Sequence, residues 1–129
     1  MTVETLFLKA AAAKLNLSAD RIATCLAKLT PDQIWARGSE NDNAAGNLVL
    51  HLAGNVRQWI LHGLGGQPDI RVRDREFSAT GEFTVDDLIA RLKSTIAEAT
   101  AVIAGLSTGQ LTSSYTVQNR TVTGVEVVL

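Results

Sequence analysis

The sequence of 129 residues contains a single cysteine, Cys25. One thiol excludes an internal disulfide and any metal site built from a cysteine cluster. No apolar run approaches the roughly 20 residues that a bilayer-spanning helix needs, so we expect no membrane partner. The first residues also lack a signal-peptide pattern, because Glu4, Lys9 and Lys14 interrupt the apolar stretch. We therefore expect a cytoplasmic protein.

The charge is nearly balanced, with 12 Lys and Arg against 13 Asp and Glu and a net charge of −1. This balance argues against a nucleic-acid partner and against binding to an anionic membrane surface. Hydrophobic residues make up 46% of the chain and charged residues 19%, which is typical of a folded protein. The length predicts one domain that covers residues 1–129.

Apolar periodicity predicts an all-α fold with three long helices, near residues 5–29, 44–64 and 84–106. In the first and third, apolar residues recur every three or four positions, which defines one face of a helix. The first stripe contains Leu8, Ala12, Leu15, Ala19, Ile22, Leu26 and Leu29, and the third contains Val85, Leu88, Leu92, Ile96, Ala99, Ile103 and Leu106.

Capping residues mark where several helices begin. Thr30 followed by Gln33 predicts a capping box and a short helical turn. Thr84 followed by Asp87 predicts a similar start for the third long helix, and Asn43 is the expected N-cap of the second.

The stretch from Gly66 to Phe83 is predicted to be a loop, and it carries alternating charges. One interpretation is a solvated surface loop whose charges pair with one another. The other is a rim of arginines beside a pocket, where they attract an anionic substrate. The charge run consists of Arg71, Arg73, Asp74, Arg75 and Glu76.

Two segments of the chain resemble each other. Leu29–Ile34 and Leu106–Leu111 share the pattern Leu, hydroxyl residue, two variable residues, Gln, aliphatic. Each is followed by a polar loop and then by Gly and an apolar run.

Residues 115–123 are expected to form an extended excursion or a short hairpin around Gln118 and Asn119. The apolar run from Gly124 then predicts a fourth helix that is only begun, so we expect the domain to be incomplete at its C-terminus.

The second long helix carries the one pattern that suggests chemistry. His51, Asn55, Gln58 and His62 fall on a narrow line at about 100° per residue, between apolar walls. Imidazole and amide groups in such a seam can bind ligands. Alternatively, each histidine is a structural residue, and His62 only complements the dipole at the helix C-terminus.

Other site types find no support in the sequence. It contains no nucleophile motif, no phosphate-binding loop before a helix and no His-Glu-x-x-His pair. His51 and His62 are about 16 Å apart on one helix, so they cannot share one ion.

The stretch Asn47–Ile60 resembles the second helix of the DinB-like superfamily, and Leu29–Trp35 and Arg73–Phe77 fit the same group. The resemblance covers nearly the whole chain. It implies an up-down-down-up four-helix bundle, often dimeric, so we expect a homodimer. Relatives include transferases that use low-molecular-weight thiols, which implies a small-molecule substrate, here a thiol of that kind.

Many members of this superfamily bind a divalent metal, here Zn or Ni, through three histidines. His51 matches the ligand of the second helix, and the other two form a His-x-x-x-His pair on the fourth. This chain ends at Leu129, where that helix begins. We therefore expect no tightly bound ion in these 129 residues alone and a three-histidine site in a longer form.

Two functions follow from these observations. The first is a metal-dependent enzyme, a thiol transferase or a hydrolase. In it His51 binds the metal, and Asn55 or Gln58 orients the His51 ring or contacts substrate. The second is a non-catalytic helical module for binding or dimerisation, in which the polar seam only specifies packing.

Overall fold

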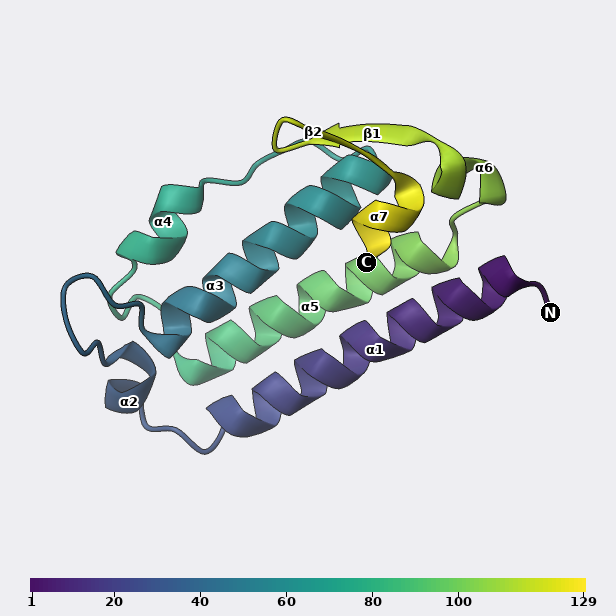
Figure 1. Ribbon diagram of the computed structural model, residues 1–129. Helices are drawn as coiled ribbons and strands as arrows, with labels where there is room; N and C mark the ends of the chain where they lie inside the picture. Colours follow the sequence, from purple (N-terminus) through teal and green to yellow (C-terminus); the bar gives the residue numbers. More distant parts are fainter.

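The computed structural model describes residues 1–129, and three long helices dominate it (Figure 1). They are α1 (Val3–Leu26), α3 (Ala45–Val56), which continues as the π-helical segment η1 (Arg57–Leu64), and α5 (Val85–Ala104). Their ends lie within three residues of the predicted ones. The predicted all-α class is confirmed, because a two-stranded hairpin is the only sheet.

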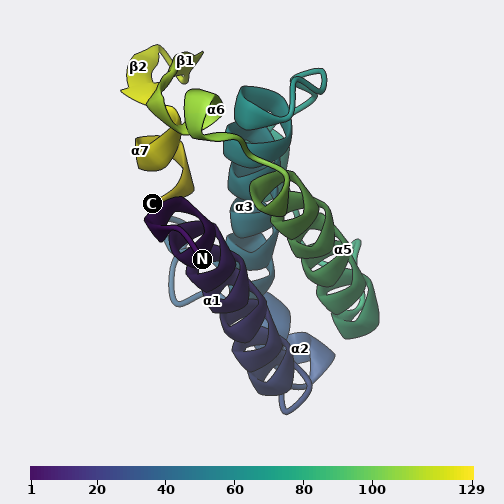
Figure 2. The same ribbon diagram turned by 90° about the vertical axis from the view of Figure 1, so that its right-hand side faces the viewer.

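The helix α5 packs against both α1 and α3. The helices α3 and α5 run in the same direction and α1 runs against them (Figures 1 and 2). The chain between η1 and α5 returns along α3 from one end of the molecule to the other (Figure 1). The fourth helix, α7 (Gly124–Val128), has five residues, so the up-down-down-up bundle remains a prediction.

The predicted apolar stripes form the core. One cluster joins the C-terminal half of α1 to the first turns of α3 and α5, with Leu26, Leu50, Leu88 and Leu92 buried. A second joins the N-terminal part of α1 to η1, the end of α5 and α7. None of the helices combines the length and apolar character that crossing a bilayer requires.

The two similar segments form similar structures. The helix α2 (Pro31–Trp35) follows Thr30, and α6 (Thr108–Thr112) follows Ser107. Both N-cap hydroxyls accept a hydrogen bond from the third helical residue, whose glutamine side chain accepts one from the cap N–H. The capping box predicted at Thr30 is therefore confirmed.

Two predictions about local structure are wrong: the N-cap of α3, and the loop that follows η1. Asn43 does not cap α3; the cap residue is Ala44, whose N–H donates to the side chain of Asn47 at 3.0 Å. The predicted loop from Gly66 to Phe83 contains a helix, α4 (Arg73–Ser78), which packs against α3. Its six residues are too few for an apolar period to be recognised.

The predicted hairpin is confirmed. Strands β1 (Ser114–Val117) and β2 (Arg120–Thr123) pair antiparallel, and the turn residues Gln118 and Asn119 have φ values of 52° and 62°. Two consecutive left-handed residues form the turn that best matches the twist of a two-residue hairpin. This turn carries Gln118 over the outer surface of η1, where its side-chain amide contacts Gln58 at 2.8 Å.

Candidate functional site

A cavity of about 420 Å³ lies between α3, the segment that precedes α4, and the hairpin turn. Three lining residues come from α3 and η1, two from the chain around the start of α4, and one from the hairpin. None of them is hydrophobic. We call this the polar pocket; its lining consists of His51, Asn55, Gln58, Arg71, Arg73 and Gln118.

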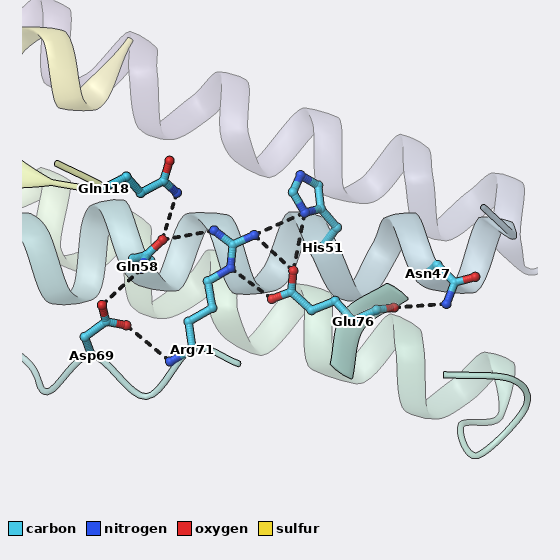
Figure 3. Close-up of polar contacts among 7 residues, drawn as sticks. All are labelled: Asn47, His51, Gln58, Asp69, Arg71, Glu76 and Gln118. Atoms are coloured by element: carbon cyan, nitrogen blue, oxygen red, sulfur yellow. Dashed lines mark hydrogen bonds and ion pairs between the residues drawn. The ribbon is translucent and has the colours of Figure 1, made fainter. Parts of the chain in front are cut away.

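Arg71, which lines the polar pocket, forms a buried ion pair with Glu76 behind it (Figure 3). Arg71 Nε donates to Glu76 Oε2 and Arg71 Nη2 to Glu76 Oε1, both at 3.0 Å. The side chains are only 4% and 10% exposed. A two-point contact of this kind fixes the guanidinium plane, and breaking a buried pair of charges is costly.

The Glu76 carboxylate lies directly against the backbone of α3. A Cβ atom at Gly54 would overlap Glu76 Oε2, so the carboxylate occupies space that a side chain would fill. Asn47 holds the same region from the other end of α4, because its Nδ2 donates to the carbonyls of Glu76 and Ala79 at 2.9 Å. A glycine and a fully buried asparagine on one helix thus fix α4 against α3.

His51 contacts the ion pair through one ring nitrogen. Its Nδ1 lies 3.1 Å from Arg71 Nη2 and 3.3 Å from Glu76 Oε1. Because an arginine is always a donor, the shorter contact favours Nδ1 as acceptor and assigns the ring proton to Nε2. Figure 3 shows this second nitrogen pointing away from the pair, on a side chain that is 30% exposed.

Amide groups extend the network toward the hairpin. Arg71 Nη1 donates to Gln58 Oε1 at 3.0 Å, and Gln58 Nε2 donates to Asp69 Oδ2 at 3.0 Å. From the hairpin, Gln118 Nε2 donates to the same Gln58 Oε1 at 2.8 Å, so Gln58 links the turn to Arg71. The hydrogen bond from Gln58, followed by that from the backbone N–H of Arg71, lowers the pKa of Asp69. Its carboxylate is therefore an anchor of the network.

The comparisons with known proteins identify a family. A model of the family described as mycothiol S-transferase matches residues 12–128. The chain belongs to the mycothiol S-transferase family. This family is part of the DinB-like superfamily of thiol transferases, so the resemblance read from residues 47–60 is confirmed. None of the curated proteins compared with the chain matches it.

In this mycothiol S-transferase family member, the described residues do not fit a complete metal site. No three side chains of His, Cys, Asp or Glu gather closely enough to hold an ion. A metal on His51 Nε2 would move the ring proton to Nδ1, which lies 3.1 Å from the donor Arg71 Nη2 and 3.3 Å from the acceptor Glu76 Oε1. The nearby carboxylate of Glu76 is used by Arg71.

Three of the four residues predicted on the polar seam lie together. His51, Asn55 and Gln58 line the polar pocket, but His62 does not. The π-helical turns of η1 change the angle per residue after Arg57, and His62 Nδ1 instead contacts the carbonyl of Gln67 at 2.7 Å. The assumption of a regular α-helix to residue 62 was therefore wrong.

Sequence reasoning missed the roles of Glu76 and Gln118, whereas Arg71 and Arg73 line the pocket as the interpretation of an arginine rim expected. The charge run does pair with itself, as one interpretation held, but the Arg71–Glu76 pair is buried rather than solvated. A signal existed at Gly54, because a glycine inside a helix often marks a close approach by another group. The sequence placed Gln118 in the expected hairpin turn, but nothing in it indicated the contact with Gln58, 60 positions away.

Proposed function

We propose that this protein transfers a low-molecular-weight thiol to a small electrophile and that the polar pocket holds the thiol. Membership of the mycothiol S-transferase family is the observation that carries the proposal. The pocket supports it, because its six lining side chains are all hydrogen-bonding groups. Amide, imidazole and guanidinium groups suit a ligand rich in hydroxyls and amides.

In the proposed reaction, His51 and Arg73 favour the thiolate over the thiol. Arg73 makes no ion pair and stacks on Phe77, with its guanidinium carbon 4.9 Å from the ring centroid. When His51 Nδ1 accepts from Arg71, Nε2 carries the ring proton and is the nitrogen that can donate to a ligand. A cation and a donor beside a sulfur lower the thiol pKa, and the thiolate is the nucleophile.

The chemical step then needs no other protein group. The thiol proton passes to solvent, the sulfur lone pair forms a carbon–sulfur bond with the electrophile, and the leaving group departs with its bonding electrons. Asn55 and Gln58 bind the polar part of the thiol. The divalent metal, Zn or Ni, implied by the superfamily would require ligands other than the described ones around His51, so no step passes through it.

The test is a thiol-consumption assay on the purified chain. We expect faster conjugation of 1-thioglucose than of propanethiol to 1-chloro-2,4-dinitrobenzene. His51→Gln should lower the rate at least 10-fold, while His62→Gln, outside the pocket, should leave it unchanged. Equal rates for these two variants would overturn the assignment of the site.

The second candidate, a non-catalytic binding or dimerisation module, predicts a different result. It requires that no thiol is consumed above the uncatalysed rate, with or without added Zn or Ni. Metal analysis after dialysis accompanies the assay, and we expect no stoichiometric ion on these 129 residues. A stoichiometric ion that is lost in His51→Ala but kept in His62→Ala would contradict this and restore His51 as a metal ligand.

A further inference from the structure

A second, larger cavity of about 840 Å³ lies between α3, α4 and α5. It shares Arg71 with the polar pocket, and its other lining residues are different. Its size lies within the range of about 300–1,000 Å³ that is usual for small-molecule sites. Neither the family match nor the thiol proposal gives this cavity a function.

The lining of the larger cavity carries an excess of positive charge. Four arginines line it, of which Arg57 and Arg71 are paired with Glu98 and Glu76. The other two, Arg75 and Arg91, have no carboxylate within ion-pair distance. The second lining carboxylate, Glu82, accepts hydrogen bonds from the backbone N–H of Thr80 at 3.0 and 3.1 Å.

Hydroxyl groups without partners also line this cavity. Thr95 is only 4% exposed, yet its side chain makes no hydrogen bond within the protein. Every fully buried side-chain polar atom of the protein has a hydrogen-bond partner. Because the Thr95 hydroxyl has none, its oxygen must be accessible from the cavity. Ser78 and Ser94 line the same cavity and likewise make no side-chain hydrogen bond. These groups can donate to an acceptor that enters the cavity.

Apolar groups complete the lining. Leu50, Ala53 and Ala79 are buried residues that contribute to it. The Phe83 ring lies under the guanidinium of Arg91, 4.8 Å from its carbon atom to the ring centroid. The stacking holds Arg91 at the cavity without neutralising it. The site thus combines apolar surface, free hydroxyl donors and two unpaired cations.

We propose that the larger cavity binds a small organic anion with an apolar body and a carboxylate, sulfonate or phosphate group. Arg75 and Arg91 bind the anionic group, and the apolar lining covers the body. If the proposed function holds, this ligand is the electrophile, because Arg71 lines both cavities and so places the ligand next to the thiol. Binding itself does not depend on that function.

The test uses the fluorescent anion 1-anilinonaphthalene-8-sulfonate and its neutral counterpart N-phenyl-1-naphthylamine. We expect the anion to bind the wild-type chain, and Arg75→Gln/Arg91→Gln to weaken its binding at least 10-fold. The matched control Arg21→Gln/Arg120→Gln removes the same charge from exposed positions outside the cavity and should leave binding unchanged. The neutral probe should respond little to either pair.

A steric variant separates this cavity from exposed apolar surface that also attracts such probes. Ser94→Trp fills the cavity from an exposed position and should abolish binding of the anion, whereas Ser94→Ala should not. Binding that survives Ser94→Trp, or falls equally in both double variants, would overturn the proposal. Because the readout is fluorescence rather than turnover, a failed thiol assay with intact probe binding overturns only the proposed function.

Discussion

Glu76 occupies the space that a side chain at position 54 would need. Its carboxylate lies against Gly54, while Arg71 Nε stands 3.2 Å from the same Cβ position. The close approach of α4 to α3, and with it the placement of Arg71 beside His51, therefore depends on a residue without a Cβ atom.

We expect Gly54→Ala to destabilise the protein and to displace the ion pair. Inserting a carbon into a packed contact costs about 1–3 kcal/mol, and a shift of Glu76 would leave two buried charges poorly matched. Urea unfolding at neutral pH measures the loss of stability. The matched control is Gly109→Ala, where the new Cβ meets only Ser107 Oγ at 3.8 Å. Equal stability of the two variants would show that Glu76 relocates freely.

The core prediction concerns α5. Leu92 and Ile96 are 2% and 5% exposed, and both belong to the cluster shared with α1 and α3. Replacing either by Ala should lower the free energy of unfolding by about 2–5 kcal/mol, because the cavity left behind closes only partly. Leu17→Ala, at an exposed position of α1, should change it by less than about 0.5 kcal/mol. Similar losses at all three positions would be inconsistent with this core.

Acid should weaken the start of α5. A hydrogen bond from the backbone N–H of Thr84, and then one from its hydroxyl, lowers the pKa of Asp87 below its ordinary value of 3.8. A lowered folded-state pKa gives stability that is present above pH 3.8 and is lost as the pH falls through the folded value. Asp87→Asn should therefore lower Tm at pH 6, with a smaller difference near pH 2.5.

The control for this prediction is Asp86→Asn. This substitution also removes a negative charge, but the side chain of Asp86 makes no hydrogen bond within the protein. Its effect on Tm should be smaller than that of Asp87→Asn at pH 6. A difference between wild type and Asp87→Asn that stays constant from pH 6 to pH 2.5 would refute the linkage.

The expected homodimer can be tested on the outer face of α1. Leu6 and Leu17 are 53% and 49% exposed there. We expect sedimentation velocity to detect a dimer at high micromolar concentration and Leu6→Glu/Leu17→Glu to yield a monomer. Leu48→Glu/Leu52→Glu tests the exposed face of α3 in the same way. A wild-type monomer at that concentration would contradict self-association.

Most of the fold could be predicted because its determinants are local. Apolar spacing defined the three long helices, and the Thr30 and Thr84 capping boxes involve residues three positions apart. The short helix α4 could not be predicted in the same way. Its six residues are held by Asn47, which lies 29 positions from Glu76, and no local pattern records such a contact.

The candidate site was predictable only where it lies on one helix. His51, Asn55 and Gln58 lie on one face of a helix, so their spacing in the sequence predicted that they are neighbours. Arg71 joins them from a separate segment, and its role depends on burial beside Glu76 that a run of charges does not indicate. The π-helical turns of η1 were not predicted either, because such turns are rare and occur within segments whose pattern is that of an α-helix.

The hairpin turn gives the polar pocket a wall that can change independently of the helices. Gln118 closes the pocket from the exposed tip of the hairpin, where Asn119 and Arg120 are also exposed, whereas Val117 is buried beside Gly63 of η1. Exposed turns accept substitutions and insertions more readily than packed helices do. Different residues at this turn would therefore reshape the pocket at little cost in stability, which offers a route by which the choice of ligand can evolve.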